Sequence, residues 1–293
     1  MDLAYLRAHP QHLPTFLTHQ RIRETPVGGG SVCTASRLTL DDGTSIFTKS
    51  WPSGEPPPGF FEAEAAGLTW LRAAGAAAVP EVIVALPDLI ALEWVEPGTP
   101  SAAAAERFGR SLAELHRSGA DTFGADWPGF IGPLPLDNTP SAGPWTSWFA
   151  ERRLLPYLKI SADRDALSAT DVAAVDQIIN QIDAYGVSEA PARTHGDLWP
   201  GNVLWAADGQ VWLIDPAAQG GHRETDLAEL ALFGGVPHLD RILAGYAEVF
   251  PLTDGWRDRV PLHQLHLLLV HTAAFGGAFS EAVHVAAAAV LRA

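Results

Sequence analysis

The sequence contains one cysteine among its 293 residues. That cysteine, Cys33, cannot form a disulfide within the chain, so disulfide-stabilised folds are excluded and a reducing, cytoplasmic location is expected. The first residues lack a basic segment followed by an apolar core, and this predicts that no secretory signal is present. A formal net charge of −15 disfavours nucleic acid and anionic membrane surfaces as partners. We therefore expect a partner that is small or cationic.

Long apolar runs are also missing. The most apolar stretch, residues 265–279, is interrupted by His266, His271 and two glycines, so it is too short and too polar to span a bilayer. A chain of 293 residues with 47% hydrophobic residues can still bury a large core. This length lies near the size at which one core divides into two. We expect two lobes, one over residues 1–95 and the other over residues 96–293.

One segment carries the strongest functional signal: His195-Gly196-Asp197-Leu198-Trp199-Pro200-Gly201-Asn202. An aspartate followed five residues later by an asparagine matches the catalytic loop of kinases. In that loop the aspartate accepts the proton of the substrate hydroxyl and the asparagine holds a metal ion. Asp197 and Asn202 occupy these two positions. The spacing predicts a site of phosphoryl transfer.

A predicted hairpin follows the loop. Two apolar runs, residues 203–205 and residues 211–214, flank the turn Asp208-Gly209. Asp215 comes directly after the second run, so the hairpin would bring it to the same end as Asn202. Carboxylate and amide oxygens are suitable ligands for the Mg²⁺ that bridges nucleotide phosphates. Asn202 and Asp215 are therefore the predicted metal ligands.

The N-terminal part of the chain has the pattern of a phosphate-binding lobe. After a short helical stretch over residues 1–20, strands are expected over residues 21–27, 32–40 and 45–51. Gly28, Gly29, Gly30 and Ser31 lie between the first two strands, and glycines let backbone N–H groups approach phosphate oxygens. Lys49, one of only two lysines, lies on the third strand and can hold the α- and β-phosphates.

A helix is expected over residues 60–74, because apolar residues recur there at helical spacing. Glu64 or Glu62 on this helix could pair with Lys49 and orient it, and Glu64 is favoured because Glu64, Leu68 and Leu71 resemble the helix pattern of phosphotransferases. Two further strands, residues 79–86 and 89–95, lead to a hinge between the lobes. Backbone groups of Glu93 and Val95 are candidates for hydrogen bonds to the adenine edge.

The rest of the chain is expected to be mainly helical, with helices over residues 101–117, 145–158 and 172–182. Asp226 is expected to begin a helix and to have a structural role. Among His263, His266 and His271, only the first two lie one helical turn apart. No nearby carboxylate or cysteine in the sequence completes a ligand set, so no metal is expected there.

The chain resembles the fructosamine (ketosamine) kinases, within the aminoglycoside phosphotransferase-like branch of the protein-kinase fold. The resemblance extends nearly end to end. Besides the glycine segment, Lys49 and the catalytic loop, it includes Phe61-Glu62-Ala63-Glu64, Gly221-His222-Arg223-Glu224, Asp226-Leu227-Ala228 and Phe275-Gly276-Gly277. Trp199 distinguishes the subfamily, because aminoglycoside and choline phosphotransferases usually have histidine or another residue there.

The resemblance implies an α+β fold of two lobes, an antiparallel sheet with one helix and a mainly helical lobe. It implies ATP and Mg²⁺ as cofactors and a glycated amine, small or protein-bound, as substrate. The reaction would be phosphorylation of a sugar hydroxyl, O3 in this family, in deglycation repair, with Trp199 against the sugar. The alternatives are a phosphotransferase acting on an aminoglycoside, choline or another amino-alcohol, and a catalytically silent nucleotide-binding module. The particular ketosamine, the oligomeric state and a redox role of Cys33 stay open.

Overall fold

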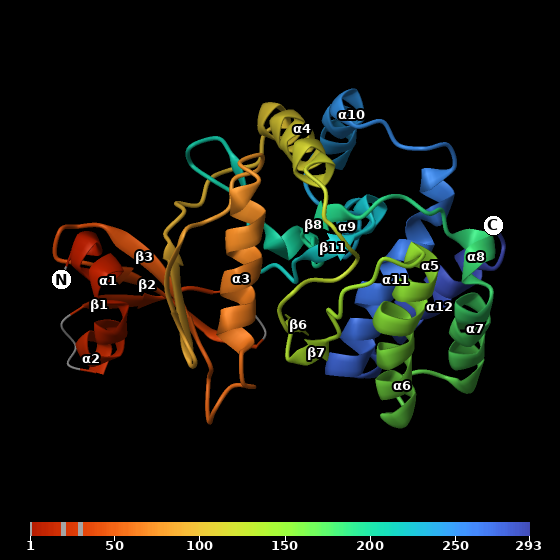
Figure 1. Cartoon of the computed structure of the whole chain (residues 1–293), viewed down its shortest axis with the longest axis horizontal. Coiled ribbons are helices and arrows are strands. Elements are labelled where there is room, and N and C mark those ends of the chain that lie inside the picture. The colour runs from red at the N-terminus through yellow and green to blue at the C-terminus, as the bar shows by residue number, and fades with distance from the viewer. Residues whose placement is uncertain (1, 19–21, 29–31) are drawn as a thin grey trace.

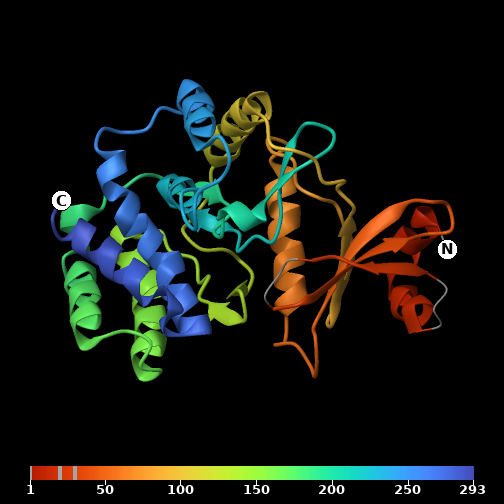
Figure 2. The same cartoon turned by 180° about the vertical axis from the view of Figure 1, so that it is seen from behind.

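The computed structural model describes residues 2–18, 22–28 and 32–293. Figure 1 shows a small sheet lobe at the N-terminal end and a larger, mainly helical lobe beside it, and Figure 2 shows the same division from behind. Of the predicted phosphate-loop residues, only Gly28 is described; Gly29, Gly30 and Ser31 lie outside the described residues. No helix in the described ranges has both the length and the apolar composition needed to cross a membrane.

The small lobe is built on one antiparallel sheet with the strand order β1-β2-β3-β5-β4. Its strands are β1 (Arg23–Pro26), β2 (Thr34–Thr39), β3 (Ser45–Ser50), β4 (Val82–Leu86) and β5 (Leu89–Glu93). Lys49 on β3 lies opposite Ala35 of β2 and Ile90 of β5, so the lysine occupies the middle of the sheet. Neighbouring strands on both sides fix its position.

Side chains alternate along each strand, so the sheet has apolar side chains on both of its faces. Leu89 and Ala91 of β5 belong to a cluster with Leu6 and Leu13 from the N-terminal helices α1 (Leu3–Ala8) and α2 (Leu13–Thr18), which the short turn η1 (Pro10–His12) connects. Ile90 and Leu92 belong to the opposite cluster, which includes buried side chains of α3 (Phe60–Ala73). The core therefore continues through both faces of the sheet.

The large lobe contains most of the helices and several short strand pairs. The helices are α4 (Ala102–Arg117), α5 (Trp145–Phe149), α6 (Leu155–Asp163), α7 (Ala169–Asn180), α8 (Ile182–Tyr185), α9 (Arg223–Glu229), α10 (Leu239–Val249), α11 (Trp256–Phe275) and α12 (Ser280–Val290). The strands are β6 (Gly129–Ile131), β7 (Leu134–Leu136), β8 (Ala192–Thr194), β9 (Val203–Trp205), β10 (Val211–Leu213) and β11 (Gln219–Gly221). Short 3₁₀ turns η3 (Pro200–Asn202) and η4 (Gly277–Phe279) complete it.

The segment that links the lobes is held by the predicted hairpin, which is present as β9 and β10. The Ala207 N–H donates to the Glu96 carbonyl at 2.8 Å, and the Gly98 N–H donates to the Trp205 carbonyl at 2.7 Å. Ser101 then caps α4 by accepting from the Ala104 N–H. The chain therefore leaves the sheet already bound to the elements that carry the catalytic loop.

The predicted helix over residues 145–158 is present as a continuous helical stretch, but it contains a π-helical turn and extends to Asp163. A π-helical turn, η2 (Ala150–Leu154), separates α5 from α6. Pro156 lies in the first turn of α6 and has no N–H to continue the hydrogen-bond ladder of the preceding turn. The turn carries Arg153 into the interior, where its guanidinium donates to Asn138 Oδ1 at 2.9 Å and to Gln219 Oε1.

Candidate active site

The catalytic loop begins where β8 ends, and glycine is required at its first bend. Gly196 has φ +80°, a left-handed conformation that other residues rarely adopt. A Cβ atom at Gly196 would lie 2.2 Å from the Ala217 carbonyl oxygen, which is closer than any packing allows. The bend lets the backbone pass next to Ala217 and starts the loop that carries Asp197.

His195 ties the loop to the end of β10. Its ring is fully buried, with Nε2 2.9 Å from the Ile214 carbonyl and Nδ1 3.3 Å from the Asp197 N–H. A neutral imidazole protonated at Nε2 satisfies both contacts, because Nε2 then donates and Nδ1 accepts. Burial lowers the pKa of His195, which favours this neutral form. The histidine therefore fixes the distance between Asp197 and the strand that leads to Asp215.

Two acidic residues of α9 accept hydrogen bonds from backbone N–H groups of the catalytic loop. Asp226 is fully buried and accepts the N–H groups of His195 at 2.7 Å and Gly196 at 2.9 Å. Glu229, one turn later, accepts the Leu198 N–H at 2.7 Å. Two effects raise the pKa of Glu229 and favour its protonated form: burial, which is the larger, and the nearby charge of Asp226. The loop backbone thus rests on one helix that lies about thirty residues further along the chain.

Asp226 was expected to begin a helix, but it lies at the fourth residue of α9, in its first turn. The helix α9 begins at Arg223, with His222 as its N-cap. Asp226 therefore lies within the helix and accepts N–H groups of the catalytic loop rather than those of its own first turn. The expected structural role is present, but its partners are distant in sequence. His116 Nε2, 3.1 Å from Asp226 Oδ2, adds a contact from α4.

The three residues predicted for proton transfer and metal binding lie together. Asn202 Nδ2 donates to Asp197 Oδ2 at 3.0 Å and to the Asp197 carbonyl at 2.8 Å. The Ile214 N–H donates to the Asn202 carbonyl at 3.2 Å, so Asp215 follows directly after a contact with the loop. The hairpin β9–β10 brings these groups to one end, as the spacing predicted. Their oxygens form a donor set of the kind that Mg²⁺ prefers.

Asp215 has an unusual backbone conformation, with φ +52°. Left-handed non-glycine residues are uncommon and often occur where a side chain must be aimed at a functional site. Burial alone would raise the pKa of Asp215, but the Lys49 ammonium outweighs burial and lowers it. Burial, followed by the charge of Asp215, raises the pKa of Asp197. The two neighbouring carboxyl groups therefore differ in proton affinity.

Lys49 lies between two carboxylates. Its Nζ atom is 2.9 Å from Glu64 Oε2 and 2.6 Å from Asp215 Oδ1. Burial would lower the pKa of Lys49, but these two charges raise it. Glu64 is buried, whereas Glu62 is exposed on the same helix, so the predicted pairing of Lys49 with Glu64 is present. The lysine is thus held in one orientation on a rigid strand.

Exchanging Glu64 for glutamine should raise KM for ATP by about 5- to 10-fold, because a charge-assisted hydrogen bond to Lys49 becomes a neutral one. Glu62→Gln provides the matched control on the same helix and should leave KM unchanged. Steady-state kinetics at varied ATP concentration measure both. Equal effects of the two substitutions would show that the Lys49 pairing does not contribute to ATP use.

The predicted hinge contacts need one correction. The Glu93 N–H donates to the Glu81 carbonyl at 2.9 Å, so it cannot also bind an adenine edge. β4 and β5 are irregularly paired between Val82 and Val84, and this bulge shifts Glu81 into contact with Glu93. Val95 lies beyond the end of β5, and its backbone has no hydrogen bond to any part of the chain that the structure describes.

Cys33 lies directly before β2 and is partly buried, and burial raises its pKa to about 11. Little thiolate is present near neutral pH at that pKa, and the thiolate is the reactive form of cysteine. The environment of Cys33 therefore disfavours a redox role.

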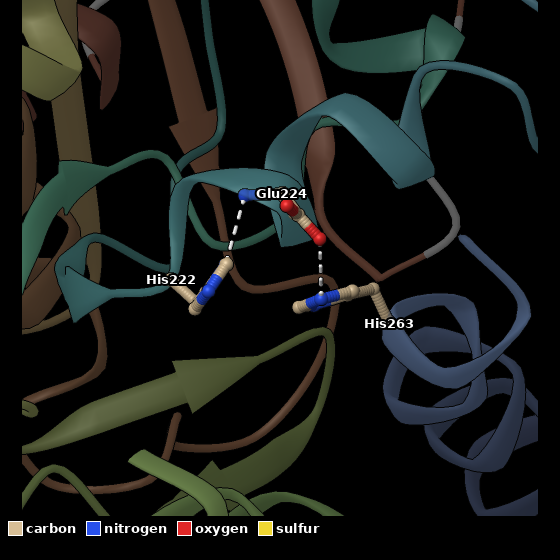
Figure 3. A group of neighbouring side chains, drawn as sticks. All are labelled: His222, Glu224 and His263. Carbon is tan, nitrogen blue, oxygen red and sulfur yellow. Dashed lines mark hydrogen bonds and ion pairs between the residues drawn. The ribbon is translucent and has the colours of Figure 1, made fainter. Parts of the chain in front are cut away.

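A buried cluster in the large lobe corrects the expectation that no carboxylate lies near His263. His222, Glu224 and His263 lie side by side in Figure 3, with His263 Nε2 3.3 Å from Glu224 Oε2. The Glu224 carboxylate also accepts hydrogen bonds from Arg259 Nε at 2.8 Å and from Arg259 Nη2 at 2.6 Å. The pKa of Glu224 is lowered to about 2. Burial alone would raise that pKa, but hydrogen bonds from Arg259 and His263 outweigh the effect of burial.

This cluster has the residue types of a metal site but an unfavourable arrangement for one. His222 Nδ1 accepts the Glu224 N–H at 3.2 Å, which places the ring proton on Nε2, the nitrogen a metal would need. Arg259 already neutralises the carboxylate. Because His222 caps α9, Glu224 lies on α9 and His263 lies on α11, the network joins these two helices and supports the helix that binds the catalytic loop.

Buried histidines should make the protein less stable in acid. Burial lowers the pKa of His266 from 6.5 to about 3, and burial also lowers the pKa values of His222 and His263. Above pH 6.5 His266 is neutral in both the folded and the unfolded state. Below that pH the unfolded state binds a proton that the folded state does not, so stability falls as pH falls towards the folded-state pKa.

The variant His266→Asn should flatten this dependence by about 1.4 kcal/mol per pH unit between about pH 6 and pH 4. Urea unfolding at several pH values measures the slope. His284→Asn is an informative contrast, because hydrogen bonding to Asp171 raises the pKa of this exposed histidine. Its stabilising contribution is complete below the ordinary pKa and lost as pH rises, so its removal should change the slope in the opposite sense. A wild-type slope retained in His266→Asn would contradict the assignment.

Trp199 lies between Asp197 and Asn202 and is half-buried. Its ring folds back over Gly201, where a Cβ atom would lie 2.2 Å from the ring. The ring therefore covers the start of η3, and glycine is the residue that leaves room for it. The Trp199 ring also contacts Phe233 with a centroid distance of 5.8 Å.

Comparisons with known proteins identify the relatives of this chain. The model of the fructosamine kinase family matches residues 9–293. The chain belongs to this family. Among curated relatives, a probable ketoamine kinase of Thermus thermophilus is 38% identical over 229 residues, covering 78% of this chain and 82% of the relative. The probable ketoamine kinase YniA of Escherichia coli strain K12 is 32% identical, with 85% and 86% covered.

Solved structures agree with the family and with the fold. A candidate fructosamine-3-kinase of Thermobifida fusca has 48% identity and a TM-score of 0.88, covering 93% of this chain and 94% of that one. An aminoglycoside phosphotransferase bound to AMP-PNP and hygromycin B has 12% identity and a TM-score of 0.68, covering 96% and 98%. The second likeness extends to the fold alone. The two-lobe protein-kinase-like fold expected for the fructosamine kinase family is therefore confirmed.

Proposed function

We propose that this protein transfers the γ-phosphate of ATP to a sugar hydroxyl of a ketosamine. The observation that carries the proposal is the convergence of Asp197, Asn202 and Asp215 beside the Lys49–Glu64 ion pair, in a chain of the fructosamine kinase family. The names of its relatives, probable ketoamine kinase and candidate fructosamine-3-kinase, support the acceptor class. Trp199 in the catalytic loop is the sequence feature that favours this class over aminoglycosides or choline.

In the proposed reaction, the acceptor oxygen forms a bond to the γ-phosphorus while the bond from that phosphorus to the ADP oxygen breaks. The proton of the hydroxyl passes to Asp197, and ADP leaves with the electron pair of the broken bond. Asn202 holds the Asp197 carboxylate through the 3.0 Å contact, so the base stays aimed at the acceptor. Most of the rate enhancement would come from positioning and charge stabilisation.

The described residues fit the cofactors that the reaction needs. Asn202 and Asp215 would hold Mg²⁺, which neutralises phosphate charge when bound. Lys49, now paired with Asp215, would contact the α- and β-phosphates with Glu64 as its remaining partner. The glycine segment that starts at Gly28 would cover the phosphates. We also propose that the lobes divide at residues 95 and 96, with the Val95 backbone and the Glu93 carbonyl facing the adenine edge.

By family resemblance, the acceptor hydroxyl is O3 of a fructosamine or ribulosamine. Phosphorylation there makes the adduct labile and regenerates the amine, so the biological role would be deglycation repair. Small and protein-bound adducts share this chemistry. Use of ATP and the unpaired Cys33 support a cytoplasmic location.

An acceptor panel tests the proposal. ADP release is measured with Mg²⁺ and ATP in the presence of fructosamines, ribulosamines, aminoglycosides and choline. We expect turnover with ketosamines alone. Turnover with an aminoglycoside or choline would assign the protein to a different acceptor class. ATP binding without turnover of any acceptor would favour a nucleotide-binding module without catalysis.

A further inference from the structure

An exposed group of aromatic rings lies next to the catalytic loop. We call it the aromatic patch and define it as Trp199, Phe233, His271, Phe275 and Phe279. The Phe233 ring is 5.8 Å from Trp199, 4.7 Å from His271 and 5.7 Å from Phe279, measured between centroids. His271 lies 5.7 Å from Phe275 and 4.8 Å from Phe279. The rings come from the loop, from the segment after α9, from α11 and from η4.

Two members of the patch remain open to solvent. Phe233 is 42% exposed and Phe275 is 45% exposed, although most large apolar side chains in the protein are buried. Isolated exposed apolar residues are ordinary, but contiguous ones that surround a reactive group indicate a binding surface. The patch includes Trp199, which lies two residues along the chain from Asp197, so it extends from the catalytic loop onto the neighbouring surface of the large lobe.

Phe233 also has a strained backbone. Its φ is +53°, and left-handed conformations are unfavourable for bulky residues. Gly234 and Gly235 follow with φ +97° and +78°, so the chain turns sharply here. A glycine or asparagine at position 233 would relieve the strain. Retaining phenylalanine keeps an aromatic ring between Trp199 and His271 at an energetic cost, as expected where the ring has a binding role.

The patch is uncharged near neutral pH. His271 Nδ1 lies 2.8 Å from the Leu267 carbonyl, and burial lowers the pKa of the ring. No residue of the patch takes part in an ion pair within the described ranges of the chain. Its surface can therefore bind an apolar group through ring contacts, and a cation over a ring face, but it offers no charge to pair with an anion.

We propose that the aromatic patch binds the amine side of the acceptor and selects small ketosamines whose amine carries an apolar or aromatic group. This inference rests on the proposed function. In a ketosamine, the amine nitrogen is bonded to C1, two carbons from the C3 that carries the accepting hydroxyl. We place the amine and its substituent on the side of Trp199 and Phe233, because an acceptor whose O3 reaches Asp197 carries its amine nitrogen on C1, two carbons from C3, and Trp199 follows Asp197 by two residues in the loop.

Two ketosamines with the same sugar and different amines test this inference. One is made from benzylamine and the other from methylamine, and kcat/KM is measured for both with wild type, Phe233→Ala and Phe275→Ala. We expect wild type to prefer the benzyl compound by about 10-fold, and each variant to reduce that preference by roughly 3- to 10-fold. The methyl compound should change by less than about 2-fold. Val285→Ala, which removes another exposed apolar side chain, is the control and should keep the preference.

The outcomes separate this inference from the proposed function. Turnover of both compounds with equal kcat/KM, or a preference that both phenylalanine variants retain, would overturn the role of the patch and leave the kinase assignment intact. No turnover of either compound would contradict the proposed function, and the inference would fall with it. Phe275 lies in a separate segment from Phe233, so the Phe275→Ala result decides the matter even where Phe233→Ala fails to fold.

Discussion

Replacing Asp197 by asparagine is expected to lower kcat by about 10²- to 10⁴-fold while ATP binds nearly as well as to the wild type. The amide has the shape of the carboxylate but cannot accept the hydroxyl proton. The loop should keep its conformation, because Asn202 Nδ2 still bonds the carbonyl of residue 197 and Asp226 still accepts the His195 and Gly196 N–H groups. The loss should therefore fall on kcat.

Single-turnover kinetics with a ketosamine, together with nucleotide binding by calorimetry, measure the two quantities separately. A melting temperature close to that of the wild type verifies that the variant is folded. Wild-type turnover in Asp197→Asn would remove Asp197 from the role of base. Loss of ATP binding together with turnover would indicate that Asp197 serves the nucleotide instead of the acceptor.

Replacing Asp215 by alanine should weaken Mg·ATP binding by about 100-fold or more, since loss of a metal-ligating carboxylate should exceed the 10- to 100-fold cost of disturbing its supporting contacts. Lys49 would keep Glu64, 2.9 Å away, as its partner. The fold should survive, because Asp215 is partly exposed, with 38% of its side chain accessible. Binding of ATP should also lose most of its dependence on Mg²⁺ concentration.

Asp208→Ala is the matched control for this experiment. Asp208 lies at the turn of the same hairpin, is exposed, and accepts hydrogen bonds from Gln210 and Trp212. Its removal should leave Mg·ATP binding unchanged. Isothermal titration over a range of Mg²⁺ concentrations compares both variants with the wild type. Equal Mg²⁺ dependence in Asp215→Ala and wild type would contradict metal binding at this residue.

The sequence predicted the parts of the site that depend on local pattern. Asn202 and Asp215 flank a hairpin whose turn residues and apolar runs are contiguous in the chain, so their proximity followed from the hairpin alone. Glu64 was preferred to Glu62 because Glu64, Leu68 and Leu71 resemble the phosphotransferase helix pattern, and the burial of Glu64 on α3 agrees. The resemblance to fructosamine kinases supplied the overall fold. These predictions needed no contact between distant segments beyond what the family pattern implied.

The features that the sequence did not predict depend on distant contacts. Asp226 and Glu229 bind loop N–H groups about thirty residues away, and no local pattern indicates that partnership. Glu224 reaches His263 across two helices, so a search for ligands close in sequence to His263 could not find it. The aromatic patch likewise combines Phe233 with His271 and Phe279, which approach only after α11 packs against α9.

The most direct test of the central claim is phosphorus and carbon NMR of the product formed from ATP, Mg²⁺ and a fructosamine enriched in ¹³C at C3. We expect one new phosphate ester whose phosphorus couples to the labelled C3, formed by the wild type and absent with Asp197→Asn. An ester formed equally well by Asp197→Asn, or ATP hydrolysis without any ester, would contradict Asp197-dependent phosphoryl transfer to a ketosamine.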